Sequence, residues 1–277
     1  MSLGSFVLVR NEAPWIAAHL LSWLPHLDEM VFLDGNSTDG TLEIIREVIK
    51  HHPQGYKVRL LTGKDPKDLQ DDYVRLFNEA MRSLSTDLAF FLHPDMIPAN
   101  IPPRADLDFL SRSAVAASVS MRSFAGDPGA QLYEIKGRGE AWKNIYRLRN
   151  PDLGAHYWGH YGHADEDVYF KAITGNRHIH HGPKFDRYPY IVQDSGIEIL
   201  HYSDVRPLPR RVDRMIKCLL NNGCSREEAE MRSASHPRVT LKDGDGFSFE
   251  PASYPTDFIV AREKYRHLEK EPSCLAA

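Results

Sequence analysis

The chain has 277 residues, of which 42% are apolar, 26% are charged and 10% are aromatic. These values are typical of a globular protein and exclude a disordered, collagen-like or coiled-coil chain. Acidic residues slightly outnumber basic ones, so the formal net charge is -4 and no excess of positive charge indicates a nucleic-acid partner.

The cysteines and the hydropathy of the sequence indicate the cellular compartment in which the protein is expected. Cys218, Cys224 and Cys274 have neither metal-binding nor redox spacing, and their odd number argues against a disulfide framework. No apolar run approaches the roughly 18 residues of a membrane span, and the amino terminus lacks a secretory signal pattern. We therefore expect a cytoplasmic protein with at most peripheral membrane contact.

Short apolar runs alternate with amphipathic segments over the first hundred residues. The apolar runs are residues 6–9, 30–33, 58–61 and 88–92. The amphipathic segments are residues 14–24, 42–49 and 73–84. Runs that are apolar throughout suit strands of a parallel sheet covered on both faces, and the amphipathic segments suit its crossover helices. The pattern predicts an α/β fold with a central, mostly parallel sheet flanked by helices, in a single enlarged domain.

The second half of the chain loses this rhythm from about Pro98. We expect mixed strands at 115–121 and 197–202, and a helix at 209–220 that stops at Gly223. The capping box that begins at Ser225 predicts a further helix.

Ligands of open α/β sheets bind beyond the carboxyl ends of the strands, and here those ends carry polar residues. Residues 34–41 contain two glycines with P-loop spacing, but no lysine follows them, and no dinucleotide fingerprint follows the first strand. A turn in which Ser37 or Asp39 caps a helix explains part of this loop. It does not explain Asp34, a carboxylate at the end of an apolar strand.

Three segments resemble the amino-terminal half of family 2 glycosyltransferases of the GT-A fold: residues 7–12, residues 28–34 and the run Ser37-x-Asp39-Gly40-Thr41. Their spacing agrees over roughly the first 95 residues. The resemblance implies a nucleotide-sugar site in which Asp34 lies near the base and ribose. The donor nucleotide residues that it implies are Val9, Arg10, Asn11, Glu12, Asp34, Asn36 and Ser37.

The resemblance also implies a D-x-D motif that holds a divalent cation against the donor diphosphate. Here the motif is His93-Pro94-Asp95, and His201 at the end of a late strand is a further candidate ligand. Because histidine suits manganese better than magnesium, we expect Mn²⁺ (or Mg²⁺) as cofactor. The alternative is structural: Pro94 ends the strand, Asp95 caps a turn and His201 is an ordinary buried histidine.

The family's catalytic base is implied to lie in an acidic pair at a helix start, which matches Glu166-Asp167, with Asp167 as the base. Three adjacent acids could instead stabilise the helix start through its dipole. Trp158 and His163 are candidates for acceptor binding. A hydrolytic zinc site in this histidine-rich segment is a rival interpretation, but no H-E-x-x-H pattern supports it.

These residues predict transfer of a sugar, with inversion, from a nucleotide diphosphate donor to a hydroxyl of a glycan, lipid-linked or small-molecule acceptor. Among possible donors, the family resemblance favours a UDP-sugar. The alternatives are a degenerate nucleotide-sugar or glycan-binding protein and a sugar-1-phosphate nucleotidyltransferase. We expect a nucleotide-sugar-binding part at 1–97, an acceptor-binding and catalytic part at 98–223 and a helical extension at 224–277. The basic run of Arg206, Arg210, Arg211 and Arg214 suits a solvated face better than a phosphate or membrane contact.

Overall fold

A computed structural model describes residues 2–62, 80, 83–104, 114–127, 131–147, 149–150, 154–155, 191–221, 223–244 and 247–270. Its strands are β1 (Leu3–Val9), β2 (Glu29–Asp34), β3 (Val58–Thr62), β4 (Leu88–Leu92), β5 (Met96–Asn100), β6 (Ala114–Gly126), β7 (Leu132–Arg147), β8 (Arg149–Asn150), β9 (Gly154–Ala155), β10 (Ile191–Val205) and β11 (Ser248–Ala252). Its helices are α1 (Ala13–Trp23), α2 (Thr41–His51), α6 (Leu208–Asn221), α7 (Arg226–Ser235), α8 (Pro237–Thr240) and α9 (Thr256–Tyr265), with 3-10 turns η1 (Gly55–Lys57) and η4 (Arg266–Leu268).

The main sheet has the strand order β3-β2-β1-β4-β7-β6-β10-β5, with β11 paired to β7. Strands β1 to β4, β6, β10 and β11 run in one direction, whereas β5 and β7 run in the other. The predicted α/β fold with a mostly parallel sheet and flanking helices is therefore confirmed. Strand β1 lies between β2 and β4 and is parallel to both, so the order in the sheet differs from the order along the chain.

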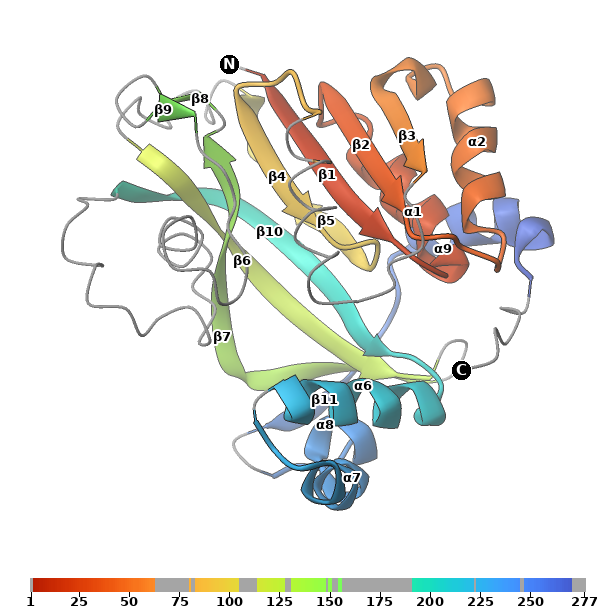
Figure 1. Ribbon diagram of the computed structural model, residues 1–277, viewed down its shortest axis with the longest axis vertical. Helices are drawn as coiled ribbons and strands as arrows, with labels where there is room; N and C mark the ends of the chain where they lie inside the picture. The colour runs from red at the N-terminus through yellow and green to blue at the C-terminus, as the bar shows by residue number, and fades with distance from the viewer. Residues whose placement is uncertain are drawn as a thin grey trace.

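Helices cover the sheet where the sequence places apolar faces. In α2 the side chains of Ile44, Ile45 and Val48 are buried, which confirms the predicted amphipathic helix. Behind the sheet, α1 packs against the distant helix α9 (Figure 1). The aromatic rings of Trp23 and Phe90 meet edge-on at 5.1 Å inside this core. Helices thus cover the first part of the sheet, and the predicted site residues lie at its edge.

The carboxyl-terminal part contains more than helices. Helices α6, α7 and α8 gather with β11 below the sheet, where β6, β7 and β10 meet (Figure 1). Ser225 caps α7 by accepting the N–H of Glu228 at 3.2 Å, as predicted. Strand β11 was not predicted, because its segment is short, polar and interrupted by Pro251. The proposed boundaries at 97 and 223 stay predictions.

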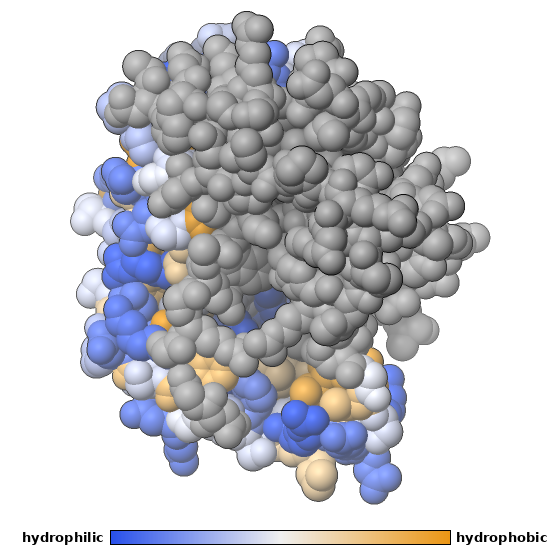
Figure 2. Space-filling model, turned by 90° about the vertical axis from the view of Figure 1, so that its left-hand side faces the viewer, coloured by the Kyte–Doolittle hydropathy of each residue, from blue (hydrophilic) through white to orange (hydrophobic). Residues whose placement is uncertain are grey.

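The surface at this end is mixed. Figure 2 shows apolar and hydrophilic residues side by side at the lower end of the molecule. Leu208 and Met231 are large apolar side chains of α6 and α7 that are exposed. Within the part of the chain that the structure describes, none of the helices is both long and apolar enough to cross a bilayer.

Candidate active site

The carboxyl ends of β1, β2 and β4 bring the predicted donor residues to one edge of the sheet. Val9, the last residue of β1, pairs with Asp34 at the end of β2. Val7 of β1 pairs with Leu92, and Asp95 follows three residues later. Asp34 and Asp95 therefore lie at the same edge, as a donor site at the strand ends requires.

The loops that follow β1 and β2 are joined by hydrogen bonds. Asn11 Oδ1 accepts the N–H of Thr38 at 2.8 Å, and Ser37 Oγ accepts the N–H of Asn11 at 2.9 Å. Glu12 N–H donates to Thr41 Oγ1 at 2.9 Å. Asn11 has φ 57°, a left-handed conformation that asparagine tolerates better than most residues. The two predicted nucleotide-binding segments therefore form one folded unit.

The Asp39 carboxylate accepts backbone N–H groups at the start of two helices. Its carboxylate accepts the N–H of Ala13, in the first turn of α1, at 2.9 Å. Its other oxygen accepts the N–H of Thr41, the first residue of α2, at 3.1 Å, next to Gly40 at the amino cap. Ser37 caps neither helix, because its hydroxyl is used by Asn11.

The other predicted nucleotide residues differ in accessibility. Asp34 is only 1% exposed, and its carboxylate accepts the N–H of Ser37 at 3.1 Å. The side chain of Val9 lies in the core, so that β1 offers only backbone groups at this position. Arg10 and Asn36 are exposed at the same edge. The role of all seven predicted residues in donor binding stays a prediction, and Arg10 and Asn36 are the exposed ones among them.

A buried polar cluster lies beside these loops. It consists of Glu12, Asp95, His201 and Arg206. Asp95 Oδ1 is 3.4 Å from His201 Nε2, and Asp95 Oδ2 is 3.2 Å from Arg206 Nη2. Arg206 Nη2 is also 3.4 Å from Glu12 Oε1. Three segments that are distant in sequence thus meet in this cluster.

Strand pairing explains how His201 arrives there. His201 in β10 pairs with Met96 in the antiparallel strand β5, directly after Asp95. The N–H of Tyr202 donates to the carbonyl of Asp95 at 2.9 Å. The next residues leave the strand, and the N–H of Arg206 donates to the carbonyl of Gly126 at 3.0 Å. One backbone hydrogen bond therefore ties β10 to Asp95, and another fixes the backbone of Arg206.

Opposing electrostatic effects set the ionisation of the two carboxylates. Burial raises the pKa of Asp95, but His201 and the guanidinium groups of Arg206 and Arg214 outweigh it and hold that pKa well below its usual range. Burial also raises the pKa of Glu12, to about 7, because the neighbouring Arg206 compensates only in part. Asp95 is consequently a fixed negative charge at neutral pH.

His93 lies close to the cluster. Its ring centre is 5.9 Å from that of His201 and 4.8 Å from that of Phe91. Burial lowers the pKa of His93 to about 4, which outweighs the opposite effect of Asp95. The imidazole is therefore neutral at pH 7 and keeps a nitrogen lone pair.

Two atoms of the cluster suit a divalent cation. Asp95 Oδ1 and His201 Nε2 are buried and make no hydrogen bond within the described residues, although they are only 3.4 Å apart. Ligands at right angles around a cation at 2.0–2.1 Å lie about 3 Å apart, so this spacing fits. Within the same described residues, no group of three or more His, Cys, Asp or Glu side chains could hold a metal ion. A cation here would need ligands from the donor as well.

The basic run after β10 corrects an expectation. We expected a solvated face, but Arg211 is only 6% exposed and donates to the carbonyls of Gly126 and Arg206 at 2.7 and 2.9 Å. Arg206 turns into the cluster, and Arg214 Nη1 lies 4.0 Å from Asp95. Arg210 is the exposed residue of the run. The run contributes to the site because the chain leaves β10 at its carboxyl end.

Four predicted residues lie outside the described part of the chain. These are the catalytic candidates Glu166 and Asp167 and the acceptor candidates Trp158 and His163. Their roles stay predictions.

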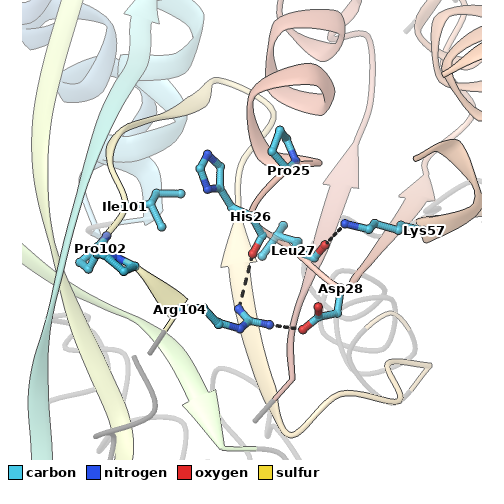
Figure 3. A pocket seen from close by; sticks show the side chains of 9 residues that line it. Pro25, His26, Leu27, Asp28, Lys57, Ile101, Pro102 and Arg104 are labelled. Atoms are coloured by element: carbon cyan, nitrogen blue, oxygen red, sulfur yellow. Dashed lines mark hydrogen bonds and ion pairs between the residues drawn. The ribbon is translucent and has the colours of Figure 1, made fainter. Parts of the chain in front are cut away.

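A separate pocket of about 430 Å³ lies at the opposite end of the sheet, before β2 and β3 (Figure 3). Lys57 donates to the carbonyls of Leu24 and Leu27, at 3.1 and 2.8 Å. Arg104 contacts Asp28 and the carbonyl of His26. Because the charged groups of Lys57 and Arg104 already contact protein oxygens, we assign no ligand to this pocket.

Comparison with known proteins agrees with the sequence motifs. Residues 6–100 match the family described as Glycosyl transferase family 2. No curated protein matches the chain.

Solved structures of glycosyltransferases resemble the chain distantly. A mannosyltransferase from Pyrobaculum calidifontis in complex with GDP-Man and Mn²⁺ is 17% identical over 96% of this chain and 70% of that chain, with a TM-score of 0.49. TarS 1-349 of S. aureus in complex with UDP is 14% identical over 88% and 76% of the chains, with a TM-score of 0.46. Because both TM-scores are below 0.5, the assignment rests on the family match and on the strand order and motifs of the chain itself. Residues 6–100 thus match glycosyl transferase family 2, and this match indicates a glycosyltransferase.

Proposed function

We propose that the protein transfers a sugar from a nucleoside diphosphate donor, a UDP-sugar first, to a hydroxyl acceptor with inversion. The acceptor oxygen bonds to the anomeric carbon while the bond from that carbon to the diphosphate oxygen breaks. The electron pair of the broken bond leaves with the diphosphate, and the hydroxyl proton passes to a base. One in-line displacement of this kind inverts the anomeric carbon.

The joined loops after β1 and β2 are proposed to bind the nucleoside. Asp34 lies at their centre, close to Ser37, while Asn36 and Arg10 are exposed beside it. The hydrogen bonds of Asn11 to Ser37 and Thr38 hold the two loops together before a donor arrives. Such preorganisation lowers the entropy cost of binding.

The single observation that carries the proposal is the pair of buried atoms Asp95 Oδ1 and His201 Nε2, which lie 3.4 Å apart and make no hydrogen bond within the described residues. A carboxylate oxygen and an imidazole nitrogen are ligands that manganese accepts, with His93 nearby as a further candidate. A bound Mn²⁺ would neutralise charge on the leaving diphosphate. The low pKa of Asp95 keeps its carboxylate ionised for this role.

The acceptor side is proposed to come from the segment after β9. Asp167 is the proposed base, with Glu166 as its nearest rival, and Trp158 and His163 are proposed to bind the acceptor. An aromatic face and hydrogen-bonding groups are the usual means of holding a sugar.

A thermal-shift panel of nucleotides with Mn²⁺ tests the proposal. A ligand that binds only the folded chain raises its stability, so a matching nucleoside diphosphate should raise the Tm. Slow donor hydrolysis should accompany binding in an active enzyme. Binding without any hydrolysis would favour the degenerate binding protein, and incorporation of a sugar 1-phosphate into a nucleotide would favour the nucleotidyltransferase. No shift with any nucleoside diphosphate would contradict the proposal.

A further inference from the structure

Arg206 lies between two carboxylates but is not tightly paired with either. Its side chain is 16% exposed, and one atom, Nη2, serves both Asp95 at 3.2 Å and Glu12 at 3.4 Å. Charge-assisted N–H···O bonds are normally 2.7–2.9 Å long. The guanidinium therefore makes two long, single contacts through one nitrogen.

Another arginine of the same chain shows what a structural pair looks like. Arg122 donates to Glu134 through Nε and Nη2 at 2.9 and 2.7 Å, as a bidentate fork. Arg206 uses its Nε for the carbonyl of Ser203 at 3.1 Å instead. Its contacts with Asp95 and Glu12 lack the geometry that fixes a guanidinium permanently.

A second guanidinium approaches the same oxygen. Arg214 is held by the carbonyl of Ser203 at 2.8 Å, and its Nη1 lies 4.0 Å from Asp95 Oδ2. Its side chain is 42% exposed. Two cations thus lie on one side of Asp95, while His201 lies on the side of the other oxygen.

The charges of this arrangement suit a diphosphate. Guanidinium groups match phosphate oxygens in geometry and remain charged at every physiological pH. The donor diphosphate carries negative charge that grows as the sugar leaves, and fixed cations stabilise such developing charge. The long contacts of Arg206 can be given up for a phosphate oxygen at small cost.

We infer that Arg206, assisted by Arg214, binds the donor diphosphate on the side of Asp95 opposite His201 and stabilises it as it leaves. Arg206 then exchanges its contact with Glu12 for a phosphate oxygen and keeps Asp95 as its anchor. This inference rests on the proposed function, because it needs a nucleoside diphosphate at this edge of the sheet.

Calorimetric titration of variants tests the inference. The ligands are UDP, GDP, uridine, guanosine and inorganic pyrophosphate, each measured in EDTA and with Mn²⁺. Arg206→Met should weaken binding of the preferred nucleoside diphosphate and of pyrophosphate roughly tenfold to hundredfold. The corresponding uncharged nucleoside should bind as before. Arg206→Lys should weaken this binding less, because lysine keeps the positive charge but lacks the two-pronged guanidinium group. The exposed Arg210, replaced by Met, is the matched control and should change nothing.

A second variant guards against misfolding at Arg206. Arg214→Met affects a half-exposed side chain and should weaken binding of the diphosphate several-fold, again without effect on the nucleoside. Unchanged diphosphate affinity in both Met variants, with a wild type that binds, would overturn the inference and leave the proposed function intact. A wild type that binds neither UDP, GDP nor pyrophosphate would overturn the proposed function and the inference with it.

Discussion

The buried His19 predicts a measurable loss of stability in acid. Its side chain in α1 is 0% exposed, and Nδ1 lies 2.9 Å from the carbonyl of Met96, which also accepts the Nε1–H of Trp23 at 2.9 Å. Because a carbonyl only accepts, Nδ1 carries the hydrogen and Nε2 is the atom that would take up a proton. Nε2 has no partner within the described residues and the ring meets Phe32 edge-on. Protonation would leave a buried charge without compensation.

The magnitude follows from the pKa. Burial lowers the pKa of His19 from 6.5 to about 4, which outweighs the opposite effects of the Met96 carbonyl and of Asp95. The unfolded chain therefore binds a proton at higher pH than the folded chain. The contribution of His19 to stability is complete above pH 6.5 and is lost as the pH falls through that value towards 4. At 1.36 kcal/mol per pH unit the loss reaches about 3 kcal/mol.

Urea unfolding of the wild type and of His19→Asn between pH 8 and pH 4 measures this loss. Asparagine places a donor near the position of Nδ1 but does not titrate, so its cavity cost is the same at every pH. Other groups, such as Glu12 with its raised pKa, are common to both proteins and cancel in the difference. The stability advantage of the wild type should shrink by about 3 kcal/mol over this range. An advantage that is independent of pH would refute the reasoning.

Three other changes have defined outcomes. Gly40→Ala should lower the free energy of unfolding by at least about 1 kcal/mol, because φ is 98° and an added Cβ would lie 1.9 Å from the carbonyl oxygen of Leu268; an unchanged Tm would contradict this contact. Ser225→Ala should cost about 1 kcal/mol in urea unfolding through loss of the α7 cap, whereas no cost would mean that the cap is dispensable. Asp167→Asn should lower kcat by roughly 10² to 10⁴ with donor affinity unchanged. Full turnover there, with collapse in Glu166→Gln, would move the base by one residue, and full turnover in both would remove the acidic pair from the mechanism.

The amino-terminal part of the fold could be predicted because its signals are local. Uninterrupted apolar runs identify β1 to β4, and the parallel pairing of β1 with β2 and β4 then forces Asp34 and Asp95 to one edge. The place of His201 followed from the family's pattern rather than from spacing. Physically it depends on the pairing of His201 with Met96, which joins strands a hundred residues apart.

The rest of the site could not be predicted because it depends on where side chains turn after the strands end. The run from Arg206 to Arg214 has the composition of a solvated face, and nothing in it indicates that Arg206 and Arg211 point inward. Glu12, which was predicted to line the nucleotide pocket, contacts Arg206, and nothing in the sequence indicates this contact. One signal was available in the sequence: a carboxylate at one strand end and a basic run at a later strand end. It could have predicted an ion pair between Asp95 and Arg206.

Manganese-dependent binding of the nucleoside diphosphate preferred in the thermal-shift panel tests the proposed site most directly. Calorimetry should detect tight binding to the wild type with Mn²⁺ and much weaker binding in EDTA. Asp95→Ala should abolish the effect of manganese, and His201→Ala should reduce it less, because each removes one of the two proposed ligand atoms. The exposed His26 in the pocket at the other end of the sheet, replaced by Ala, should leave the effect intact. Equal manganese-dependent affinity in the wild type, Asp95→Ala and His201→Ala would contradict the site.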